Sequence, residues 1–262
     1  MLEATDITVR LGRREILHGV DFRARPGELT AIVGPNGSGK TTLLRALTGD
    51  LSQDGRVRLN GQDLSSLRPW VLAGLRGVLP QATPLAFPFT VAEVVRLGLM
   101  GGIEAAEADL VPKALARVGL AGFEGSYFQE LSGGEQQRVQ LARVLAQVWR
   151  PTANGCPHWL FLDEPVSSLD IGHQLQVMRV ARDYADQGGG VVTVMHDLNL
   201  TAMFADRVTL LAEGRVLAQG TPADVFRDEA LSRAYRCPIR VNTPPEGGTY
   251  LLPHAAGQVA AE

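Results

Sequence analysis

The chain has 262 residues, of which 45% are hydrophobic and 20% charged, and its formal net charge at pH 7 is −3. This length fits one α/β domain with insertions, and the near-neutral charge gives no electrostatic footprint for DNA or RNA, so we expect no nucleic-acid partner. No stretch reaches the roughly 18 apolar residues needed to cross a bilayer, the first residues lack a signal-peptide pattern, and two cysteines are too few for a disulfide framework. We therefore expect a cytosolic protein that reaches a membrane only through a partner.

The N-terminal part of the chain alternates strand patterns with turns. Residues 2–11 alternate apolar and polar side chains, which predicts a half-buried strand, and a turn at 12–14 leads into a second strand that ends near 20–22. Residues 29–33 are short, continuous and β-rich, as in a strand buried on both faces. A glycine-rich loop follows, and residues 42–47 predict a helix that Gly49 ends.

Three later segments, residues 77–79, 159–162 and 191–194, also have the pattern of buried strands, with helical stretches between them. This alternation of strands and helices predicts a mainly parallel sheet covered by helices. The absence of an internal repeat excludes two tandem modules of this kind in the chain.

The middle and the end of the chain differ from this alternation. Residues 90–149 contain helical patterns without a convincing strand, at 91–99, 111–118 and 135–148. We interpret this section as a helical subdomain inserted into the fold. Residues 208–217 predict a late antiparallel hairpin, and 241–262 form a Pro- and Gly-rich tail in which we expect order only at 250–252.

A phosphate-binding loop is predicted directly after the buried strand at 29–33. Its sequence, Gly-Pro-Asn-Gly-Ser-Gly-Lys-Thr, fits the Walker A pattern, and it lies between a strand and a helix as that pattern requires. Glycines let successive N–H groups face the phosphates, and the helix start adds its positive dipole end. Lys40 supplies a mobile positive charge, and the Thr41 hydroxyl can ligate Mg²⁺. A glycine-rich turn without a ligand is the alternative, which the strand–loop–helix context disfavours. The predicted nucleotide-binding residues are Gly34, Pro35, Asn36, Gly37, Ser38, Gly39, Lys40, Thr41 and Thr42.

Polar side chains follow the other predicted core strands. Asp163 and Glu164 come directly after 159–162, His196 follows 191–194, and Gln81 follows 77–79. Ligands bind at the carboxyl ends of strands in open parallel sheets, so Asp163 should lie near Mg²⁺ and Glu164 should face an attacking water. The Gln81 amide could reach the metal or the water. The alternatives are a solvated turn at 163–164 and a purely structural role for His196. The phosphate loop in the same sequence disfavours both.

A second anion-binding motif lies at residues 131–138, Leu-Ser-Gly-Gly-Glu-Gln-Gln-Arg, which resembles the signature motif of the ATP-binding subunits of ABC transporters. The resemblance extends over essentially the whole chain. Ser132, Gly133 and Gly134 open a helix with a hydroxyl and bare N–H groups, and Ser132 with Glu135 also fits a capping box. In the family this motif meets the γ-phosphate bound by the other subunit. The resemblance therefore implies that Ser132, Gly133, Gly134 and Glu135 bind ATP in trans.

The resemblance also assigns roles to the strand-end residues. Gln81 matches the Q-loop, Asp163 the Walker B aspartate, Glu164 the catalytic base, 168–170 the D-loop and His196 the switch histidine. It thus implies that Glu164 and His196 are catalytic. It implies that Thr41, Gln81 and Asp163 hold Mg²⁺.

Two positions depart from the family pattern. Glu135 stands where the signature usually has glutamine. The aromatic residue on which adenine commonly stacks is absent, and the alignment places Val9 there, which leaves the contact with the base open.

As a fold, the resemblance implies a RecA-like P-loop NTPase in a single domain, 1–262, with a mainly parallel sheet and an N-terminal antiparallel β part. Its nucleotide-binding core comprises 1–89 and 150–240, its helical subdomain 90–149 and its C-terminal tail 241–262. The implied partners are a second copy of the chain, an integral membrane permease dimer and, indirectly, a periplasmic substrate-binding protein. The implied location is peripheral, at the cytoplasmic face of the inner membrane.

Within the family, the chain most resembles importers of iron chelates and cobalamin, and among these the haemin-import ATPases. Residues 79–81, 85–91 and 196–200 and the loop at 150–158 carry this resemblance. Ferric siderophore and cobalamin are alternative cargoes. A soluble ABC ATPase acting on nucleic acid or ribosomes is an alternative of another class, although the tandem modules, coiled-coil arms or basic patches usual there are absent. A nucleotide-gated module without hydrolysis is a third alternative, disfavoured by Glu164 and His196.

Overall fold

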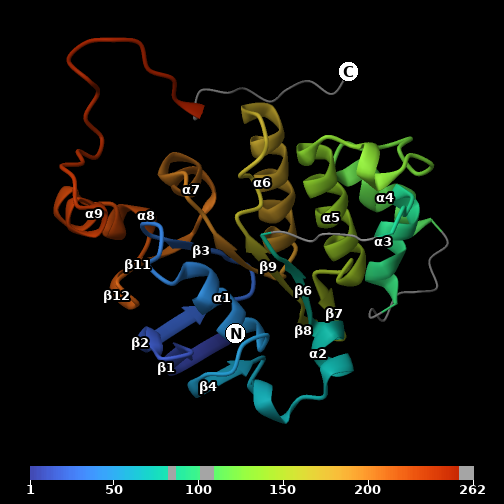
Figure 1. Cartoon of the computed structure of the whole chain (residues 1–262), viewed down its shortest axis with the longest axis horizontal. Helices are drawn as coiled ribbons and strands as arrows, with labels where there is room; N and C mark the ends of the chain where they lie inside the picture. The colour runs from blue at the N-terminus through green and yellow to red at the C-terminus, as the bar shows by residue number, and fades with distance from the viewer. Residues whose placement is uncertain (82–86, 101–108, 254–262) are drawn as a thin grey trace.

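The computed structural model describes residues 1–81, 87–100 and 109–253, and Figure 1 shows their arrangement. Its centre is a six-stranded sheet with the order β12-β11-β3-β10-β9-β6. All neighbours pair in parallel except β12, which is antiparallel to β11. The predicted mainly parallel sheet is therefore confirmed. The bounds are β3 (Leu29–Val33), β6 (Arg76–Leu79), β9 (Trp159–Asp163), β10 (Gly190–Val194), β11 (Arg207–Ala212) and β12 (Arg215–Gly220).

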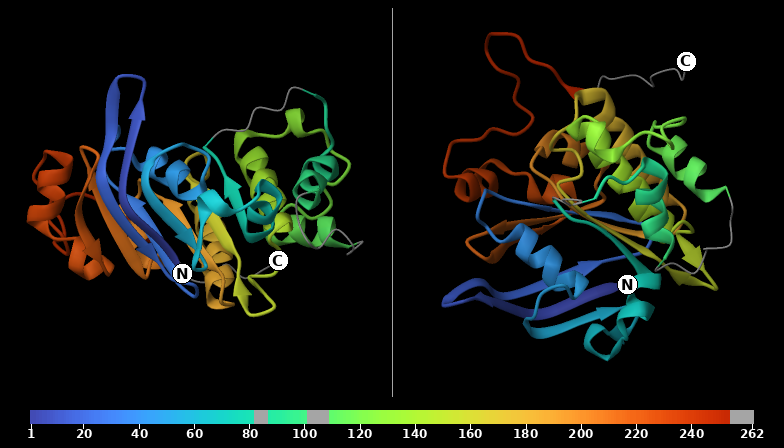
Figure 2. Two further views of the ribbon diagram at one scale, coloured as in Figure 1. Left: turned by 90° about the horizontal axis from the view of Figure 1, so that it is seen from below. Right: turned by 45° about the vertical axis from the view of Figure 1, so that its right-hand side comes forward.

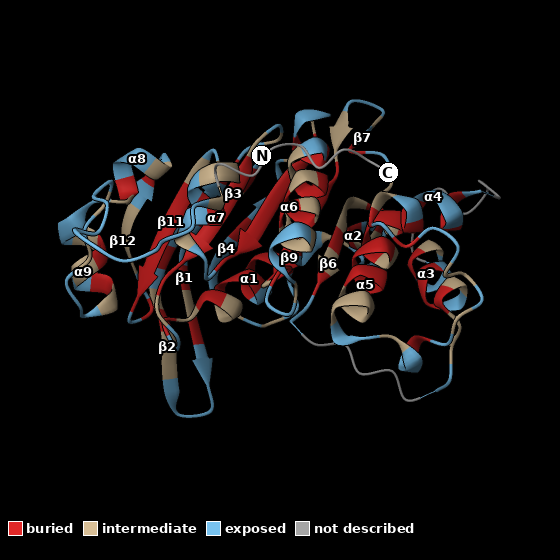
Figure 3. Cartoon of the chain, turned by 90° about the horizontal axis from the view of Figure 1, so that it is seen from above, coloured by how far each residue is buried: buried red, intermediate tan, exposed pale blue. Residues whose placement is uncertain are grey.

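The middle strands of this sheet are short apolar runs because both of their faces are covered. Every residue of β3, β9 and β10 is buried. Strands that alternate in burial can face water on one side, whereas these strands have no exposed face. Figure 3 shows the continuous buried band that they form through the molecule.

A second, antiparallel sheet carries the N-terminus and has the order β2-β1-β4-β5. The hairpin of its two long strands projects beyond the rest of the molecule, as Figure 2 shows. This sheet confirms the predicted N-terminal antiparallel part. Its strands are β1 (Leu2–Leu11), β2 (Arg14–Ala24), β4 (Asp54–Leu59) and β5 (Gln62–Asp63).

Helix α1 (Lys40–Thr48) lies between the two sheets and contacts strands of both. Its buried leucines, Leu43, Leu44 and Leu47, join a core cluster with residues of β1, β2 and β4. Gly49 ends the helix with φ 77°, as predicted. The helix that follows the phosphate loop is therefore fixed in place by packing on both of its sides.

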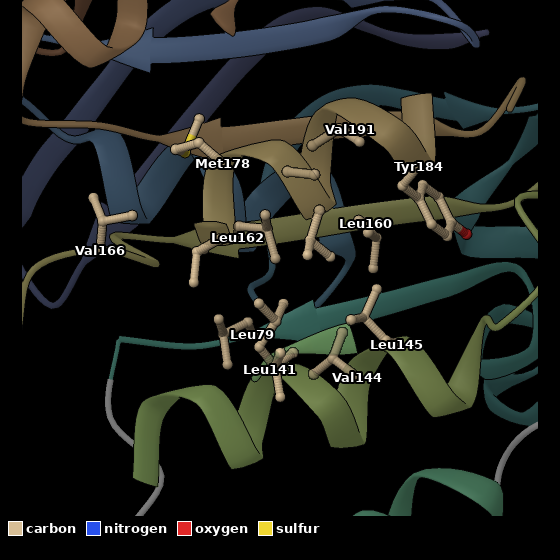
Figure 4. Packing of buried hydrophobic residues seen from close by; sticks show 14 of the residues in the cluster. Leu79, Leu141, Val144, Leu145, Leu160, Leu162, Val166, Met178, Tyr184 and Val191 are labelled. Carbon is tan, nitrogen blue, oxygen red and sulfur yellow. The ribbon is translucent and has the colours of Figure 1, made fainter. Parts of the chain in front are cut away.

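The opposite face of the central sheet is covered by α6 (Ile171–Asp186), α7 (Leu198–Phe204) and the group α3 (Val91–Leu99), α4 (Leu110–Arg117) and α5 (Gly133–Gln147). Figure 4 shows Leu141, Val144 and Leu145 of α5 packed toward Leu79 of β6 and Leu160 of β9. These contacts attach the helical group to the sheet beside the strand ends.

Within the helical group, α5 packs against both α3 and α4. A Cβ at Gly98 of α3 would lie 2.1 Å from the carbonyl oxygen of Arg143, so glycine permits the close approach of the two helices. The three helices match the predicted patterns within two residues at each end. The further division of the chain at 89/90, 149/150 and 240/241 stays a prediction.

Several short elements complete the described part of the chain. They are η1 (Leu64–Ser66), α2 (Pro69–Leu75), η2 (Phe128–Glu130), β7 (Thr152–Ala153), β8 (Cys156–Pro157), α8 (Pro222–Val225) and α9 (Asp228–Tyr235). The loop predicted at 150–158 thus contains a small hairpin, β7–β8. No helix among the described residues has the length and apolar character that spanning a bilayer requires.

The expectation of local order at residues 250–252 is wrong. The segment forms no helix or strand, and its side chains are 53%, 81% and 52% exposed. Three apolar residues in a row suggested a packed segment. Here they gain little from burial, because they follow a Pro- and Gly-rich stretch that lies on the surface.

Candidate functional site

The predicted strand-end residues converge at one edge of the central sheet. Strands β3, β10, β9 and β6 are parallel neighbours, so their carboxyl ends meet there. A pocket of about 640 Å³ opens at this edge. Its lining combines residues of the β1–β2 hairpin, the phosphate loop with the start of α1, and side chains that follow β6, β9 and β10. These residues are Leu11, Arg14, Ile16, Asn36, Gly37, Gly39, Lys40, Thr41, Thr42, Gln81, Glu164 and His196. Segments more than 150 residues apart in the chain thereby form a single site.

The phosphate loop needs its glycines for conformation and space. Gly34, Gly37 and Gly39 have φ values of 149°, 76° and 101°, which other residues rarely adopt. A Cβ at Gly34 would also lie 2.0 Å from the carbonyl oxygen of Leu211. The loop therefore passes directly over β11 and delivers the chain to the start of α1. Pro35 and Ser38 line an adjoining hollow, which shares Asn36 and Gly37 with this pocket.

Lys40 is almost completely buried at the start of α1, with 6% of its surface exposed. Its Nζ donates hydrogen bonds to the carbonyl oxygens of Gly34 (2.9 Å) and Pro35 (3.0 Å). Burial lowers the pKa of Lys40, and the nearby charges of Glu164 and Asp163 oppose this shift. The ammonium group is thus held inside the loop that an anionic phosphate would enter.

Asp163 lies beside Thr41 at the floor of the site. The Thr41 hydroxyl donates to Asp163 Oδ1 over 3.2 Å, and only 4% of the aspartate is exposed. Burial raises the pKa of Asp163, partly offset by the hydrogen bond from Thr41. Magnesium prefers a few hard oxygen ligands together with phosphates and water. An adjacent hydroxyl and carboxylate at the phosphate loop fit such an ion.

Glu164 holds the position from which a base could act on water. Its carboxylate lies between two donors: Oε1 is 2.5 Å from Nε2 of His196, and Oε2 accepts from Nε2 of Gln81 over 3.0 Å. The backbone of Glu164 has φ 52°, the left-handed region that non-glycine residues avoid. Strained backbone of this kind persists only where its surroundings fix it, and it concentrates at functional sites.

The segment Ser132–Glu135 lies elsewhere, at the start of α5. Ser132 caps the helix: its hydroxyl accepts from the N–H of Glu135 over 3.3 Å, and Glu135 Oε2 accepts from the N–H of Ser132 over 2.8 Å, so the predicted capping box is present. Hydrogen bonds from Ser132 lower the pKa of Glu135. Among the described residues, those that line the nucleotide pocket do not include this segment, which borders a separate hollow with Asp170 and His173. Within one chain, this segment and the pocket at the strand ends are therefore separate.

Val9, which the alignment places where the family has its adenine-stacking aromatic residue, does not line the pocket. Val9 is fully buried in the core between the two sheets and cannot reach a nucleotide. Val9 follows the alternation of β1 and faces the core on the same side as Ile7. The residues that line the pocket from the hairpin are Leu11, which is 46% exposed, Arg14 and Ile16. These three residues were not predicted from the sequence. A signal was available for Leu11, which is apolar, directly precedes the turn at Gly12 and lies beyond the part of the strand that joins the core.

Residues 17–167, more than half of the chain, match the family model described as ABC transporter. The chain belongs to the ABC transporter family. As an ATP-binding subunit of that family it binds and hydrolyses ATP. ATP-binding subunits of this family form dimers, and those of importers act with a membrane permease.

The relatives match nearly the full length of the chain. It is 65% identical to the hemin import ATP-binding protein HmuV of Jannaschia sp. (strain CCS1), covering 98% of this chain and 95% of that protein. The protein of the same name from Roseobacter denitrificans is 63% identical, with 98% and 99% covered. That of Rhizobium meliloti is 56% identical over the same shares.

Solved structures of ABC transporter ATP-binding subunits have the same fold as this chain. An ATP-binding subunit of an ABC transporter superposes with a TM-score of 0.77 at 25% identity, covering 88% of this chain and 94% of that one. A dimeric ATP-binding cassette in a post-hydrolysis state, bound to ADP and Pi, gives a TM-score of 0.73 at 26% identity, with 85% and 99% covered. The predicted P-loop NTPase fold is therefore confirmed.

Proposed function

We propose that this chain drives the import of haemin across the inner membrane, as a homodimer bound to the cytoplasmic face of a permease dimer, with a periplasmic protein delivering the cargo. The observation that carries this proposal is identity of 65% with a hemin import ATP-binding protein over nearly the full length of both chains. Cargo does not bind the nucleotide pocket, so its assignment depends on this similarity and not on the site.

For the nucleotide, we assign binding to the phosphate loop and its flanks. Lys40 and the N–H groups of residues 34–42 would hold the phosphates, and the helix start of α1 would contribute its dipole. Thr41 and Asp163, with Gln81 beside them, would hold Mg²⁺. When bound, the ion supplies positive charge next to the phosphates.

For hydrolysis, we assign the general base to Glu164 and its orientation to His196 and Gln81. The support is the geometry of the carboxylate, whose two oxygens each have one of these donors. A carboxylate fixed in this way can accept a proton from a water that attacks the γ-phosphate, and the imidazole can stabilise the developing charge.

For the second half of the site, we propose that two copies close head to tail, each presenting Ser132, Gly133, Gly134 and Glu135 to the nucleotide of its partner. The N–H groups at the start of the 15-residue helix α5 are suited to an anion. Hydrogen bonds tie the carboxylate of Glu135 to Ser132 and the N–H of Glu135 to the Ser132 hydroxyl, so the N–H groups of Gly133 and Gly134 are the helix donors left for a phosphate.

Reconstitution tests the assignment of the cargo. The chain and its permease are placed in liposomes, and ATP hydrolysis is measured with substrate-binding proteins loaded with haemin, cobalamin or a ferric siderophore. We expect the haemin-loaded protein to stimulate hydrolysis and to deliver haemin to the lumen. Stimulation by cobalamin or siderophore with haemin silent would overturn the cargo assignment and leave the ATPase intact.

A further inference from the structure

One side chain of the signature helix reaches the backbone of the proposed base. Nε2 of Gln137, in α5, donates a hydrogen bond of 3.0 Å to the main-chain carbonyl oxygen of Glu164. Gln137 lies one turn after Gly133, on the same face of the helix. The start of the signature helix and the proposed base are therefore joined by one turn of helix and one hydrogen bond.

The backbone of Glu164 is a place where such a contact has consequences. Its φ of 52° is unfavourable for a residue with a Cβ, so neighbouring groups must hold it there. Its N–H donates to the carbonyl oxygen of Val194 (3.2 Å), and its own carbonyl accepts from the N–H of Ser167 (3.3 Å) as well as from Gln137. Val194 belongs to strand β10 of the central sheet, and Ser167 lies three residues after Glu164 in the same loop. Gln137 adds a hydrogen bond from α5, in the helical group.

Gln137 lies where the helical group meets the loop that follows β9. It borders a hollow of about 380 Å³ together with Gln81, Gly133 and Ser168, that is, with the Q-loop residue, the signature segment and the D-loop segment. Its Oε1 is buried and has no hydrogen-bond partner among the described residues. Its amide nitrogen makes the hydrogen bond to Glu164, so Gln137 connects the helical group with the loop that follows β9.

We propose that Gln137 is a positioning residue, which holds the strained backbone of Glu164 and makes hydrolysis depend on the placement of the signature helix. This inference rests on the proposed role of Glu164 as the base. A displacement of α5 relative to the sheet would move the carbonyl of Glu164 and, with it, the carboxylate between Gln81 and His196. Hydrolysis is thereby favoured only when α5 holds the carboxylate of Glu164 between Gln81 and His196.

The test compares two glutamines on the same helix. Gln137→Met keeps the volume of the side chain and removes the donor. The matched control is Gln147→Met, because Gln147 also donates from α5 to main-chain carbonyls of another segment, those of Ala73 (2.8 Å) and Arg76 (3.0 Å), but far from the site. A small misplacement of a reacting group costs up to about 100-fold. We expect Gln137→Met to lower kcat by roughly 10- to 100-fold with little change in KM for ATP, and Gln147→Met to leave both nearly unchanged.

A double-mutant cycle with Glu164→Gln shows whether Gln137 acts through Glu164. Residues that act as a unit are not additive, so adding Gln137→Met to Glu164→Gln should cause little further loss. Additive losses, an unchanged kcat in Gln137→Met, or an equal fall in the Gln147→Met control would each overturn the inference. If Glu164→Gln itself keeps normal turnover, the role of Glu164 fails instead. Should Gln137→Met not fold, Gln137→Glu, which has no N–H when ionised, must show the same fall in kcat.

Discussion

Leu11 and Val9 lie two residues apart in β1 and have opposite surroundings, which makes them a test of where the nucleotide base binds. Val9 is fully buried between the sheets, whereas Leu11 is 46% exposed on the wall of the pocket beside Arg14 and Ile16. Replacing each by alanine should therefore separate affinity for the nucleotide from stability of the fold.

The expected magnitudes follow from burial. Complete burial of a leucine contributes about 1.5–3 kcal/mol, so covering the exposed 46% of Leu11 by a base contributes about 0.7–1.4 kcal/mol. This corresponds to roughly a three- to tenfold weaker Kd for ADP in Leu11→Ala, with little loss of stability. Val9→Ala should instead cost about 1–3 kcal/mol of stability, because it opens a cavity in a packed core, and leave the Kd unchanged.

Titration calorimetry with ADP and denaturant unfolding without nucleotide measure the two quantities on the same samples. Leu11→Tyr gives a change in the opposite direction, because an aromatic ring offers a flat face on which the base can stack, and it should tighten binding. The reasoning is refuted if Val9→Ala weakens ADP binding without loss of stability, or if both Leu11 variants bind ADP as the unchanged protein does.

Three further predictions concern the site itself. Glu164→Gln should bind ATP, lose roughly 10²- to 10⁴-fold in turnover and accumulate an ATP-bound dimer in size-exclusion chromatography; near-normal turnover would remove Glu164 from its role. Lys40→Ala and Ser132→Arg chains, each inactive alone, should regain activity when mixed, because each heterodimer contains one intact site; heterodimers that form without recovery would contradict a shared site. Asp163→Asn should abolish hydrolysis yet stabilise the nucleotide-free protein at pH 7 by about 0.5–2 kcal/mol, because burial raises the pKa of Asp163 and its ionised form opposes folding above that pKa. This gain, measured by denaturant unfolding across pH, should disappear toward acid pH, and a variant no more stable than the original chain at pH 7 would refute the reasoning.

The sequence was informative where a physical constraint acts over a few neighbouring residues. A buried strand must be a short apolar run, and a phosphate loop must have glycines where φ is positive, so β3, β9 and Gly34–Gly39 could be predicted. The convergence of Gln81, Glu164 and His196 also followed, because the parallel order of the strands places their ends together.

Other features depend on contacts between distant segments and could not be predicted in this way. The exposure of Leu11 on the wall of the pocket, two residues after the buried Val9, depends on how far the β1–β2 hairpin projects beyond the core, and the alternation within β1 does not reveal this. The hydrogen bond of Gln137 to Glu164 joins residues 27 positions apart, and nothing in the signature motif distinguishes Gln137 from Gln136 beside it. Gln136 donates back to Leu131 in its own segment, whereas Gln137 reaches the loop that follows β9.

The two pKa shifts in the site have a common consequence for how nucleotide and fold are linked. Burial lowers the pKa of Lys40 and raises that of Asp163, so in both cases the folded protein opposes the charged form. Phosphates would offset this for Lys40, and a bound cation would do so for Asp163, so each charge becomes less unfavourable when its partner is present. Binding should therefore stabilise the fold as well as prepare the chemistry: at a ligand concentration 100 times Kd, linkage predicts a gain of about 2.7 kcal/mol. Asp163→Asn removes the charge that the cation would offset. The extra stability that Mg²⁺ adds to that given by ADP alone should therefore be smaller in this variant than in the original chain. If Mg²⁺ adds the same stability to both proteins, Asp163 does not face the cation.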